Sequence, residues 1–447
     1  MGADENPAAD WIARNAISLT SVNATEGFED LLPLIPLLES ARIIAIGEGT
    51  HGTREFFTVR HRLIELLVAE LGVRVFAFEF PYGEGLEINE YIRTGQGDPY
   101  EILSRVYCPP WNHQEMIDLI EWMRSFNASR ETSDLVQFHG IDIHDGSSTL
   151  ISESILHYVS AVEPARVAEF AEVLDCFRYT SMYDAILIAA DRSGSCLGKL
   201  EWVAEEIAGE REAWEARSSH AACDAALHEA ELLVQRAEIF TAAARGQLEA
   251  DNLRDRYLAE NLTWLIDSLD GGEEVQVAFS AHSYHVGRYR LPLASPLQGM
   301  RVSMGWHLNE AFGPAYAILG MIAGAGEVAV FPRPGSSRVS DEEGYGPLQH
   351  EVVDLPWLPA GRIADAFRSS GLSICAVDVR GSEKDADAEW LWETRPLLQI
   401  GTSFAPHSFS SYAVKIAVPR AFDLLLYIEE TTAPTILPWR PADSLEP

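Results

Sequence analysis

The stretch at residues 42–80 reads RIIAIGEGTHGTREFFTVRHRLIELLVAELGVRVFAFEF. Its first five residues are mostly apolar and rich in isoleucine, which predicts a short buried strand. A glycine-rich turn follows, and apolar residues at helical spacing predict a helix over residues 53–71, which Gly72 ends. Residues 73–80 predict a second buried strand. A strand, a helix and a strand in this order predict a parallel sheet with a right-handed crossover.

Similar patterns extend outward from this unit. They predict helices at 84–93 and 114–127, two helices joined by a turn within 10–40, and surface loops at 332–340 and 381–387. Further strands are predicted at 135–143, 275–280, 302–306 and 373–379, and a pair at 413–418 and 424–429 closes an edge.

The pattern changes between residues 149 and 269, where Ala, Glu, Leu and Arg dominate and strand signals are few. The prediction is an α/β fold with a mainly parallel sheet flanked by helices, interrupted by a large helical insertion. Residues 1–148 form the first part of the core, residues 149–271 form the insertion as a wall or lid of the cleft, and residues 272–447 complete the core.

The charge of the chain restricts its partners. The net charge is -35, and only three of the 33 basic residues are lysines, namely Lys199, Lys384 and Lys415. Nucleic acids and anionic membranes both attract basic surfaces, so neither is an expected partner. A solvated acidic surface is the simpler explanation of the charge, and attraction of a cationic substrate is the alternative.

The five cysteines are scattered and include no C-x-x-C pair, which favours reduced thiols. The acidic start MGADENPAADW lacks the features of a signal peptide, and no apolar run has the length of a membrane span. These features predict a cytoplasmic location.

Polar residues gather where four of the predicted strands end. In open parallel sheets, ligands bind beyond the carboxyl ends of the strands, so these side chains are expected to meet in one cleft. The four groups are GEGTHG at 47–52, Glu79, HGIDIH at 139–144 and HSYH at 282–285.

Each candidate residue also has a structural interpretation. Glu48 and His51 form either a helix cap with a satisfied histidine or an activated histidine whose tautomer the carboxylate selects, and the second is favoured. Glu79 is either an acceptor at the end of the sheet or a site residue. Asp142 orients a histidine or caps a loop.

The basic candidate residues also have both a structural and a functional interpretation. Arg254 with Asp255 is either a surface ion pair or part of the site, and Arg60 binds a substrate carboxylate or faces solvent. His61 and His113 are expected to be structural.

Three motifs are considered and disfavoured. Gly47, Gly49 and Gly52 spell G-x-G-x-x-G, but Glu48 would repel a pyrophosphate at that turn. The H-x-x-H at 282–285 lacks the helical context of a zinc site, so no metal and no other cofactor is expected. GSCLG at 194–198 has no preceding strand to form a nucleophile elbow.

The chain resembles the erythromycin esterase family, which includes succinoglycan-biosynthesis-like members. The resemblance is carried by GEGTHGTREFFTVRHRLIELLVAELGVRVFAFEF (47–80), WNHQEMIDLIEWMRSFN (111–127), VQFHGIDIH (136–144), RDRYLAENLTWLID (254–267) and VAFSAHSYH (277–285). It implies hydrolysis of a macrolide lactone by water, without an acyl-enzyme and without an essential metal.

The resemblance also assigns roles to residues. It implies His51 as the general base beside Glu48, with Glu79, His282 and His285 in the catalytic cleft. It also implies Arg60 in the cleft, and Glu55 and Arg254 match family positions. Together with His139 and Asp142 from the end of the third strand, these three residues are the substrate-binding candidates. The family usually has an aromatic residue at the position of His139 and Asn-Gly at the position of Ser283-Tyr284, so the resemblance does not fix the substrate.

The working hypothesis is an ester or lactone hydrolase acting on a small molecule. His51 takes a proton from water, Glu48 or Glu79 orients the water, and His282, His285 and Arg60 stabilise the oxyanion. Two alternatives stay open. One is a natural-product tailoring enzyme that uses the same cleft for elimination, cyclisation or isomerisation, and the other is a binder of small molecules without turnover.

Overall fold

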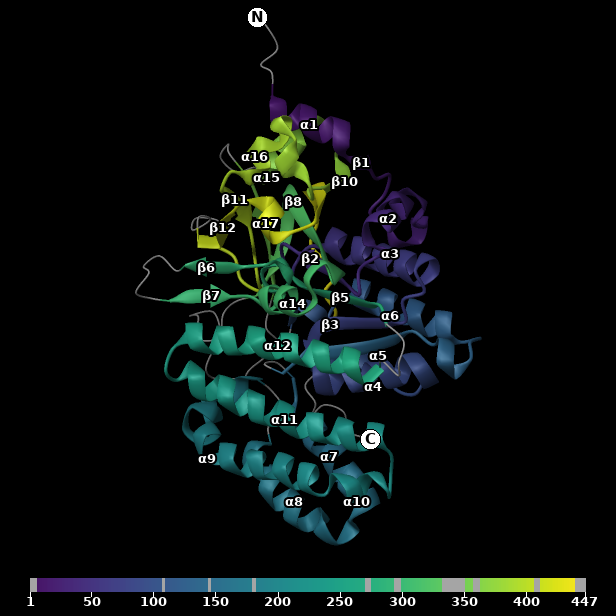
Figure 1. Ribbon diagram of the computed structural model, residues 1–447, viewed down its shortest axis with the longest axis vertical. Helices are drawn as coiled ribbons and strands as arrows, with labels where there is room; N and C mark the ends of the chain where they lie inside the picture. The colour runs from purple at the N-terminus through teal and green to yellow at the C-terminus, as the bar shows by residue number, and fades with distance from the viewer. Residues whose placement is uncertain are drawn as a thin grey trace, which may run out of the picture.

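The computed structural model describes residues 6–106, 109–143, 146–178, 182–269, 275–292, 299–331, 350–356, 362–405 and 411–438. The predicted strand–helix–strand unit is present as β2 (Ile43–Glu48), α3 (Arg54–Glu70) and β3 (Val75–Pro81). Every residue of both strands is buried, because helices cover both faces of the sheet. This arrangement confirms an α/β fold with a mainly parallel sheet (Figure 1).

The central part of the sheet is parallel. Its strands lie in the order β13 (Leu424–Thr431), β8 (Tyr316–Val330), β2, β5 (Val277–His282), β3 and β4 (Gln137–Asp142). These neighbours all pair in parallel, and Glu48 is in register with His282 of β5. The carboxyl ends of four strands that carry predicted site residues therefore meet at one edge.

Antiparallel strands complete the sheet. Beyond β13 lie β10 (Ile374–Asp378) and then β1 (Ile17–Ser18), and β9 (Glu351–Leu355) pairs with the end of β8. Two small sheets stand apart from it, one formed by β6 (Arg290–Pro292) with β7 (Met300–Val302) and one by β11 (Arg395–Leu398) with β12 (Ala413–Ile416).

Several predicted elements were wrong. The predicted strand at 302–306 is instead the end of β7 followed by α14 (Met304–Phe312), which the Ser303 side chain caps. The segment 424–429 lies inside the sheet as β13, and 413–418 belongs to the separate β11–β12 sheet. The long central strand β8 was missed, because its alanines and glycines give neither alternation nor a β-branched run.

The predicted pair of helices at 10–40 is also only partly correct. It consists of α1 (Pro7–Asn15), the edge strand β1, short 3₁₀ turns at Ala24–Glu26 and Glu29–Leu34, and the single turn α2 (Ile35–Leu38). The predicted loop at 381–387 contains 3₁₀ turns at Ser382–Lys384 and Ala386–Ala388. The predicted loop at 332–340 lies outside the described residues.

Helices cover the two faces of the sheet. One core joins α3, α4 (Tyr82–Thr94), α5 (Pro99–Arg105) and α6 (Gln114–Asn127) to the sheet, and the bounds of α6 match the prediction. The other core joins α1, α12 (Gln247–Leu269), α14, α15 (Ile363–Ser370) and the short helices α13 (Ser283–Val286), α16 (Glu389–Trp392) and α17 (Val418–Ala421).

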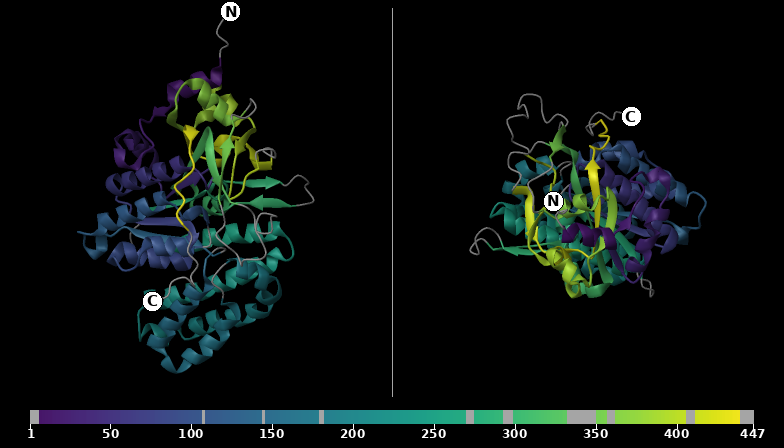
Figure 2. Two further views of the ribbon diagram at one scale, coloured as in Figure 1. Left: turned by 180° about the vertical axis from the view of Figure 1, so that it is seen from behind. Right: turned by 90° about the horizontal axis from the view of Figure 1, so that it is seen from above.

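The region predicted as an insertion is helical. Its helices are α7 (Ser148–Val162), α8 (Val167–Leu174), α9 (Met182–Gly209), α10 (Arg211–Glu215), α11 (His220–Ala243) and α12. They enclose a core of their own, and Figure 1 shows α12 between this bundle and the sheet. α12 supplies Tyr257 to the bundle core and Leu258 and Leu262 to the sheet core. The bundle lies at the opposite end of the molecule from α1 (Figure 2).

The four cysteines that the structure describes, Cys176, Cys196, Cys223 and Cys375, are free thiols. Among the described helices, none combines the length and the apolar character that a bilayer crossing requires. GSCLG lies within α9 and not at the end of a strand, so it is not a nucleophile elbow.

Candidate active site

A cleft of about 460 Å³ opens where β2, β3, β4 and β5 end. Six residues that the sequence predicts for the site line it: His51, Glu79, Asp142, Arg254, His282 and His285. The rest of its described lining comes from other parts of the chain: Trp111, Tyr284, Arg301, Gln399, Gly401, Thr402, Ser411, Tyr412 and Val414. The predicted strand ends therefore converge on one polar hollow.

Glu48 and His51 form a hydrogen-bonded pair on one side of this cleft. The Glu48 side chain is fully buried, and its Oε1 lies 2.8 Å from Nδ1 of His51. A carboxylate only accepts hydrogen bonds, so this contact selects the His51 tautomer with its hydrogen on Nδ1, which leaves the lone pair on Nε2. The His51 ring packs between the rings of Trp111 and His282, at centroid distances of 4.8 and 4.9 Å.

The glycines around this pair allow close packing of the turn. A Cβ on Gly52 would lie 1.9 Å from the carbonyl oxygen of Ala329, and one on Gly47 would lie 2.6 Å from the Val286 side chain. Neither contact is sterically tolerable, so the G-x-G-x-x-G spelling is explained by packing against β8 and α13.

Arg60 lies beneath the pair. It is 1% exposed, and its Nη1 donates to Glu48 Oε2 at 2.8 Å and to Ser280 Oγ at 3.2 Å. Its guanidinium lies between the rings of Phe57 and Phe78, at 4.7 and 4.6 Å from their centroids. Burial lowers the pKa of Arg60, and Glu48 opposes that effect. The alternative that Arg60 faces solvent is wrong, and the residue does not line the cleft.

A second network is centred on Glu79 and His285. Oε2 of Glu79 accepts the backbone N–H of His282 at 2.8 Å, and Oε1 accepts from Arg254 Nη2 at 2.9 Å. His285 Nε2 lies 3.3 Å from the same Oε1, and His285 Nδ1 lies 2.7 Å from Asp255 Oδ1. His285 therefore bridges two carboxylates.

These contacts set the charges of the network. Burial acts to raise the pKa of Glu79, but His285, Arg254 and His51 together hold it well below the ordinary value. Burial lowers the pKa of His285, but Asp255 and Glu79 outweigh burial and the repulsion of Arg254, raising it to about 9. Glu79 is thus an anion and His285 a cation near neutral pH.

Arg254 joins this network to the end of β4. Its Nε donates to Asp142 Oδ1 at 3.2 Å and its Nη2 to Asp142 Oδ2, while Nη1 lies 3.1 Å from His285 Nε2. Arg254 with Asp255 is not a surface ion pair, since Asp255 is fully buried and contacts His285. Among the described residues of the cleft wall, Arg254 and Arg301 are the two arginines, and they accompany the His285 cation.

His282 is held by its backbone neighbours. Its Nε2 donates to the carbonyl of Ile400 at 3.1 Å, and its Nδ1 accepts from the N–H of Tyr284 at 3.2 Å. Burial lowers the pKa of His282 well below its ordinary value. A neutral ring with both nitrogens occupied has no hydrogen to give an oxyanion, so His282 positions its neighbours.

Besides Glu48 and Arg60, two predicted site residues, Glu55 and His139, are not among the described residues that line the cleft. Glu55 accepts from the N–H and Oγ1 of Thr432, at 2.8 and 2.7 Å, and so anchors the start of α3. His139 is partly buried in β4, its Nε2 has no hydrogen-bond partner among the described residues, and burial lowers its pKa to about 4. His144 lies outside the described residues.

Sequence reasoning missed several residues of the site. Trp111 packs on His51, Asp255 holds His285, and Gln399 lines the cleft with both side-chain polar atoms lacking a hydrogen-bond partner within the described chain. Asp255 directly follows the candidate residue Arg254 in the sequence, but no local pattern indicates that Gln399 belongs to the site. Gln399 comes directly after β11, far in the sequence from the predicted site residues.

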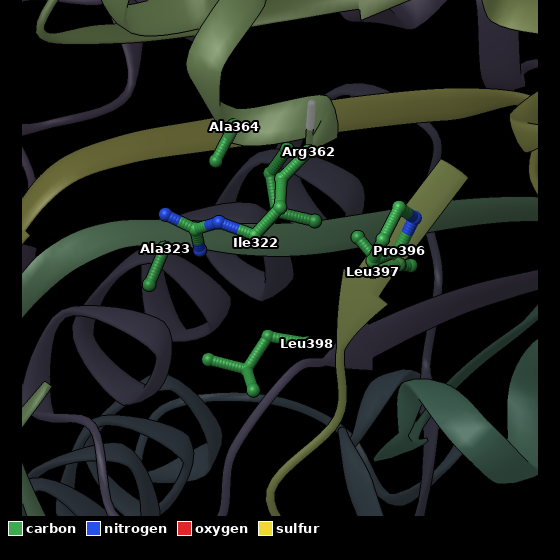
Figure 3. A pocket seen from close by; sticks show the side chains of 7 residues that line it. All are labelled: Ile322, Ala323, Arg362, Ala364, Pro396, Leu397 and Leu398. Carbon is green, nitrogen blue, oxygen red and sulfur yellow. The ribbon is translucent and has the colours of Figure 1, made fainter. Parts of the chain in front are cut away.

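A further hollow near β8 is much smaller. It measures about 10 Å³ and lies among Ile322, Ala323, Arg362, Pro396 and Leu398 (Figure 3). That volume is about enough for one water molecule, so it does not suit an organic substrate.

Over the described residues, no group of three or more His, Cys, Asp and Glu side chains is placed to hold a metal ion. The carboxylates and imidazoles of the cleft instead pair with one another and with arginines. The fold and the site together define an α/β protein with a buried carboxylate–imidazole cleft at the ends of parallel strands.

Comparison with known proteins identifies the family. The model of the erythromycin esterase family matches residues 68–431, and the chain belongs to this family. It is 25% identical to erythromycin esterase type II of Escherichia coli, over 96% of this chain and 99% of that protein. It is 22% identical to the putative hydrolase YbfO of Bacillus subtilis, over 88% and 85% of the two chains. These names support a hydrolase at the level of the family.

Solved structures share the fold. A Bacillus cereus protein superposes with a TM-score of 0.81 at 22% identity, covering 97% of this chain and 100% of that chain. A mutant of the erythromycin esterase EreC in its open conformation superposes with a TM-score of 0.69 at 17% identity, covering 94% and 98%. The fold is therefore shared over nearly the whole chain.

Proposed function

We propose that the protein hydrolyses an ester or lactone of a small molecule with a water molecule activated by His51. The observation that carries this proposal is the Glu48–His51 hydrogen bond, which leaves the Nε2 lone pair on a histidine that lines the cleft. A histidine in this state takes a proton from water near neutral pH. Macrolide lactones are the first substrates to test, because erythromycin esterases are among the relatives.

The steps follow from this geometry. Water gives a proton to His51 Nε2 while its oxygen bonds to the carbonyl carbon, and the carbonyl oxygen becomes an oxyanion. The tetrahedral intermediate then breaks its bond to the alcohol oxygen, which takes the proton from His51. The Glu48 carboxylate stabilises the imidazolium between the two transfers, and Arg60 keeps Glu48 in place.

Oxyanion stabilisation is assigned to different residues from those the sequence suggested. Both ring nitrogens of His282 are occupied and Arg60 is out of reach of the cleft, whereas Arg254 and Gln399 line it. A carboxamide N–H or a guanidinium directed at the developing charge lowers the barrier. Glu79 is an ionised acceptor for Arg254 and His282, so its role is to hold these groups and not to carry the proton.

Water, and not a side chain, is the proposed nucleophile. No hydroxyl or thiol among the described cleft residues is hydrogen-bonded to His51, whose described polar partner is Glu48. A covalent mechanism needs a nucleophile paired with its base. The proposed reaction therefore forms no acyl-enzyme.

The test combines a substrate screen with isotope labelling. Macrolide and simpler lactones are incubated with the protein in ¹⁸O water, and mass spectrometry follows the product. We expect one ¹⁸O in the new carboxylate and a loss of kcat of ~10²–10⁴ in His51→Gln, with an unchanged melting curve. Product without ¹⁸O would support the tailoring alternative instead, and near-normal turnover of His51→Gln would refute the assignment of the base.

A further inference from the structure

A second cavity, of about 590 Å³, lies beside the cleft. Tyr284 lines the cleft and Tyr289 lines the second cavity, with ring centroids 5.4 Å apart. In β12, Val414 lines the cleft, whereas Lys415 lines the second cavity. The two hollows are neighbours, but no residue lines both of them.

The second cavity is basic in a strongly acidic chain. Arg288, Arg290, Lys415 and Arg420 line it, and none of its described lining residues carries a carboxylate. The whole chain has 68 acidic and 33 basic residues. A cluster of basic residues with no acidic residue among them is therefore unusual for this chain.

Three of these cations have no carboxylate partner within the described part of the chain. Arg288 pairs with Asp423 at 2.7 Å, but the described residues place no carboxylate in an ion pair with Arg290, Lys415 or Arg420. Elsewhere in the chain, exposed arginines such as Arg380 pair with acids. Three cations gathered at one cavity without paired acids make the cavity attractive to an anion.

The cavity also offers flat apolar surfaces. Trp306 and Trp392 line it with Leu291 and Ile416, and the Arg290 guanidinium lies 5.5 Å from the Trp306 ring centroid. Indole rings pack well against planar or apolar groups of a ligand. The guanidinium N–H groups of arginine donate hydrogen bonds to the oxygens of carboxylate, phosphate or sulfonate groups.

We propose that this cavity, lined by Arg288, Arg290, Lys415, Arg420, Trp306 and Trp392, is a binding site for an organic anion with a planar apolar body. The anionic group lies at Arg290, Lys415 and Arg420, and the apolar body packs on the indoles. The site does not depend on the hydrolytic chemistry of the cleft.

The experiment uses naphthalene-1-sulfonate as the probe, because it joins an anion to a flat apolar ring and has no ester bond. Calorimetric titration of the full chain at low ionic strength is expected to give one site with a Kd below ~1 mM. Uncharged naphthalene-1-methanol is expected to bind at least ~10-fold more weakly, since it lacks the charge that the cations recognise.

Charge reversal locates the site. Lys415→Glu with Arg420→Glu is expected to weaken binding of the sulfonate at least ~10-fold, because both residues are exposed and their substitution leaves the core intact. The matched control is Lys384→Glu with Arg256→Glu, which makes the same charge change at exposed residues outside the cavity and is expected to alter the Kd less than ~2-fold.

The variant Arg254→Gln shows whether the sulfonate binds in the second cavity or in the neighbouring cleft. This variant removes a cation of the cleft, and sulfonate binding is expected to persist in it. Absence of saturable binding, equal binding by the Lys415→Glu/Arg420→Glu variant, or loss of binding only in Arg254→Gln would each overturn the proposal. None of these outcomes depends on whether the protein hydrolyses a lactone.

Discussion

Glu48 contributes both to the stability of the folded protein and to the proposed catalysis by His51. The variant Glu48→Gln is expected to affect both quantities, and each can be measured. The carboxylate is fully buried, and it accepts from His51 at Oε1 and from Arg60 at Oε2, each at 2.8 Å. A glutamine accepts at one of these atoms and presents N–H to the other donor. The substitution therefore leaves the Arg60 charge, which is 1% exposed, without its counter-ion.

The magnitudes follow from that loss. Breaking a buried ion pair by removing one partner costs about 3–5 kcal/mol of the free energy of unfolding. Losing the group that selects the His51 tautomer lowers kcat by ~10²–10⁴. Urea unfolding measures the first quantity, and hydrolysis of the lactone found by the substrate screen measures the second.

The double variant Glu48→Gln/Arg60→Met distinguishes a chemical role from a structural one. Methionine fits the apolar slot between Phe57 and Phe78 and removes the stranded charge. Stability is expected to return to within about 1–2 kcal/mol of the original protein, because both members of the pair are gone. Activity is expected to stay low, and recovery of kcat together with stability would refute the proposed role of Glu48.

Three further predictions concern other parts of the site. Gln399→Met is expected to lower kcat/KM by ~10² without loss of stability, because the amide has no described protein partner; unchanged kinetics would exclude it as an oxyanion donor. The free energy of unfolding is expected to fall between pH 6.5 and about 9, because folded His285 holds a proton that the unfolded chain has released; Asp255→Asn, followed by urea unfolding across this range, is expected to flatten that dependence. His139→Phe is expected to change kcat less than ~2-fold and to reduce the loss of stability between pH 6.5 and about 4, because folded His139 resists protonation; a ~10-fold loss of kcat would instead return His139 to the substrate-binding residues.

Local sequence patterns were sufficient to predict those helices and strands whose formation depends mainly on their own residues. The periodicity of 42–80 predicts β2, α3 and β3, and the bounds of α6 are those predicted. The polar residues that follow β2, β3, β4 and β5 were expected to converge, and six of them or their partners do line one cleft. Convergence is predictable because parallel strands end at a common edge.

Tertiary structure determined the features that depend on a distant neighbour. The place of β13 inside the sheet follows from pairing with β8, whose alanines and glycines carry no clear strand signal of their own.

The same holds for the roles of side chains. Arg60 is a buried support for Glu48, Asp255 a partner of His285, and Gln399 part of the cleft, although nothing local to these residues indicates it. A repeated pattern of apolar residues specifies which face of a helix or strand is buried. The partner of a charge and the protonation of an imidazole depend instead on desolvation and on contacts between residues far apart in the chain, which exist only once the chain has folded.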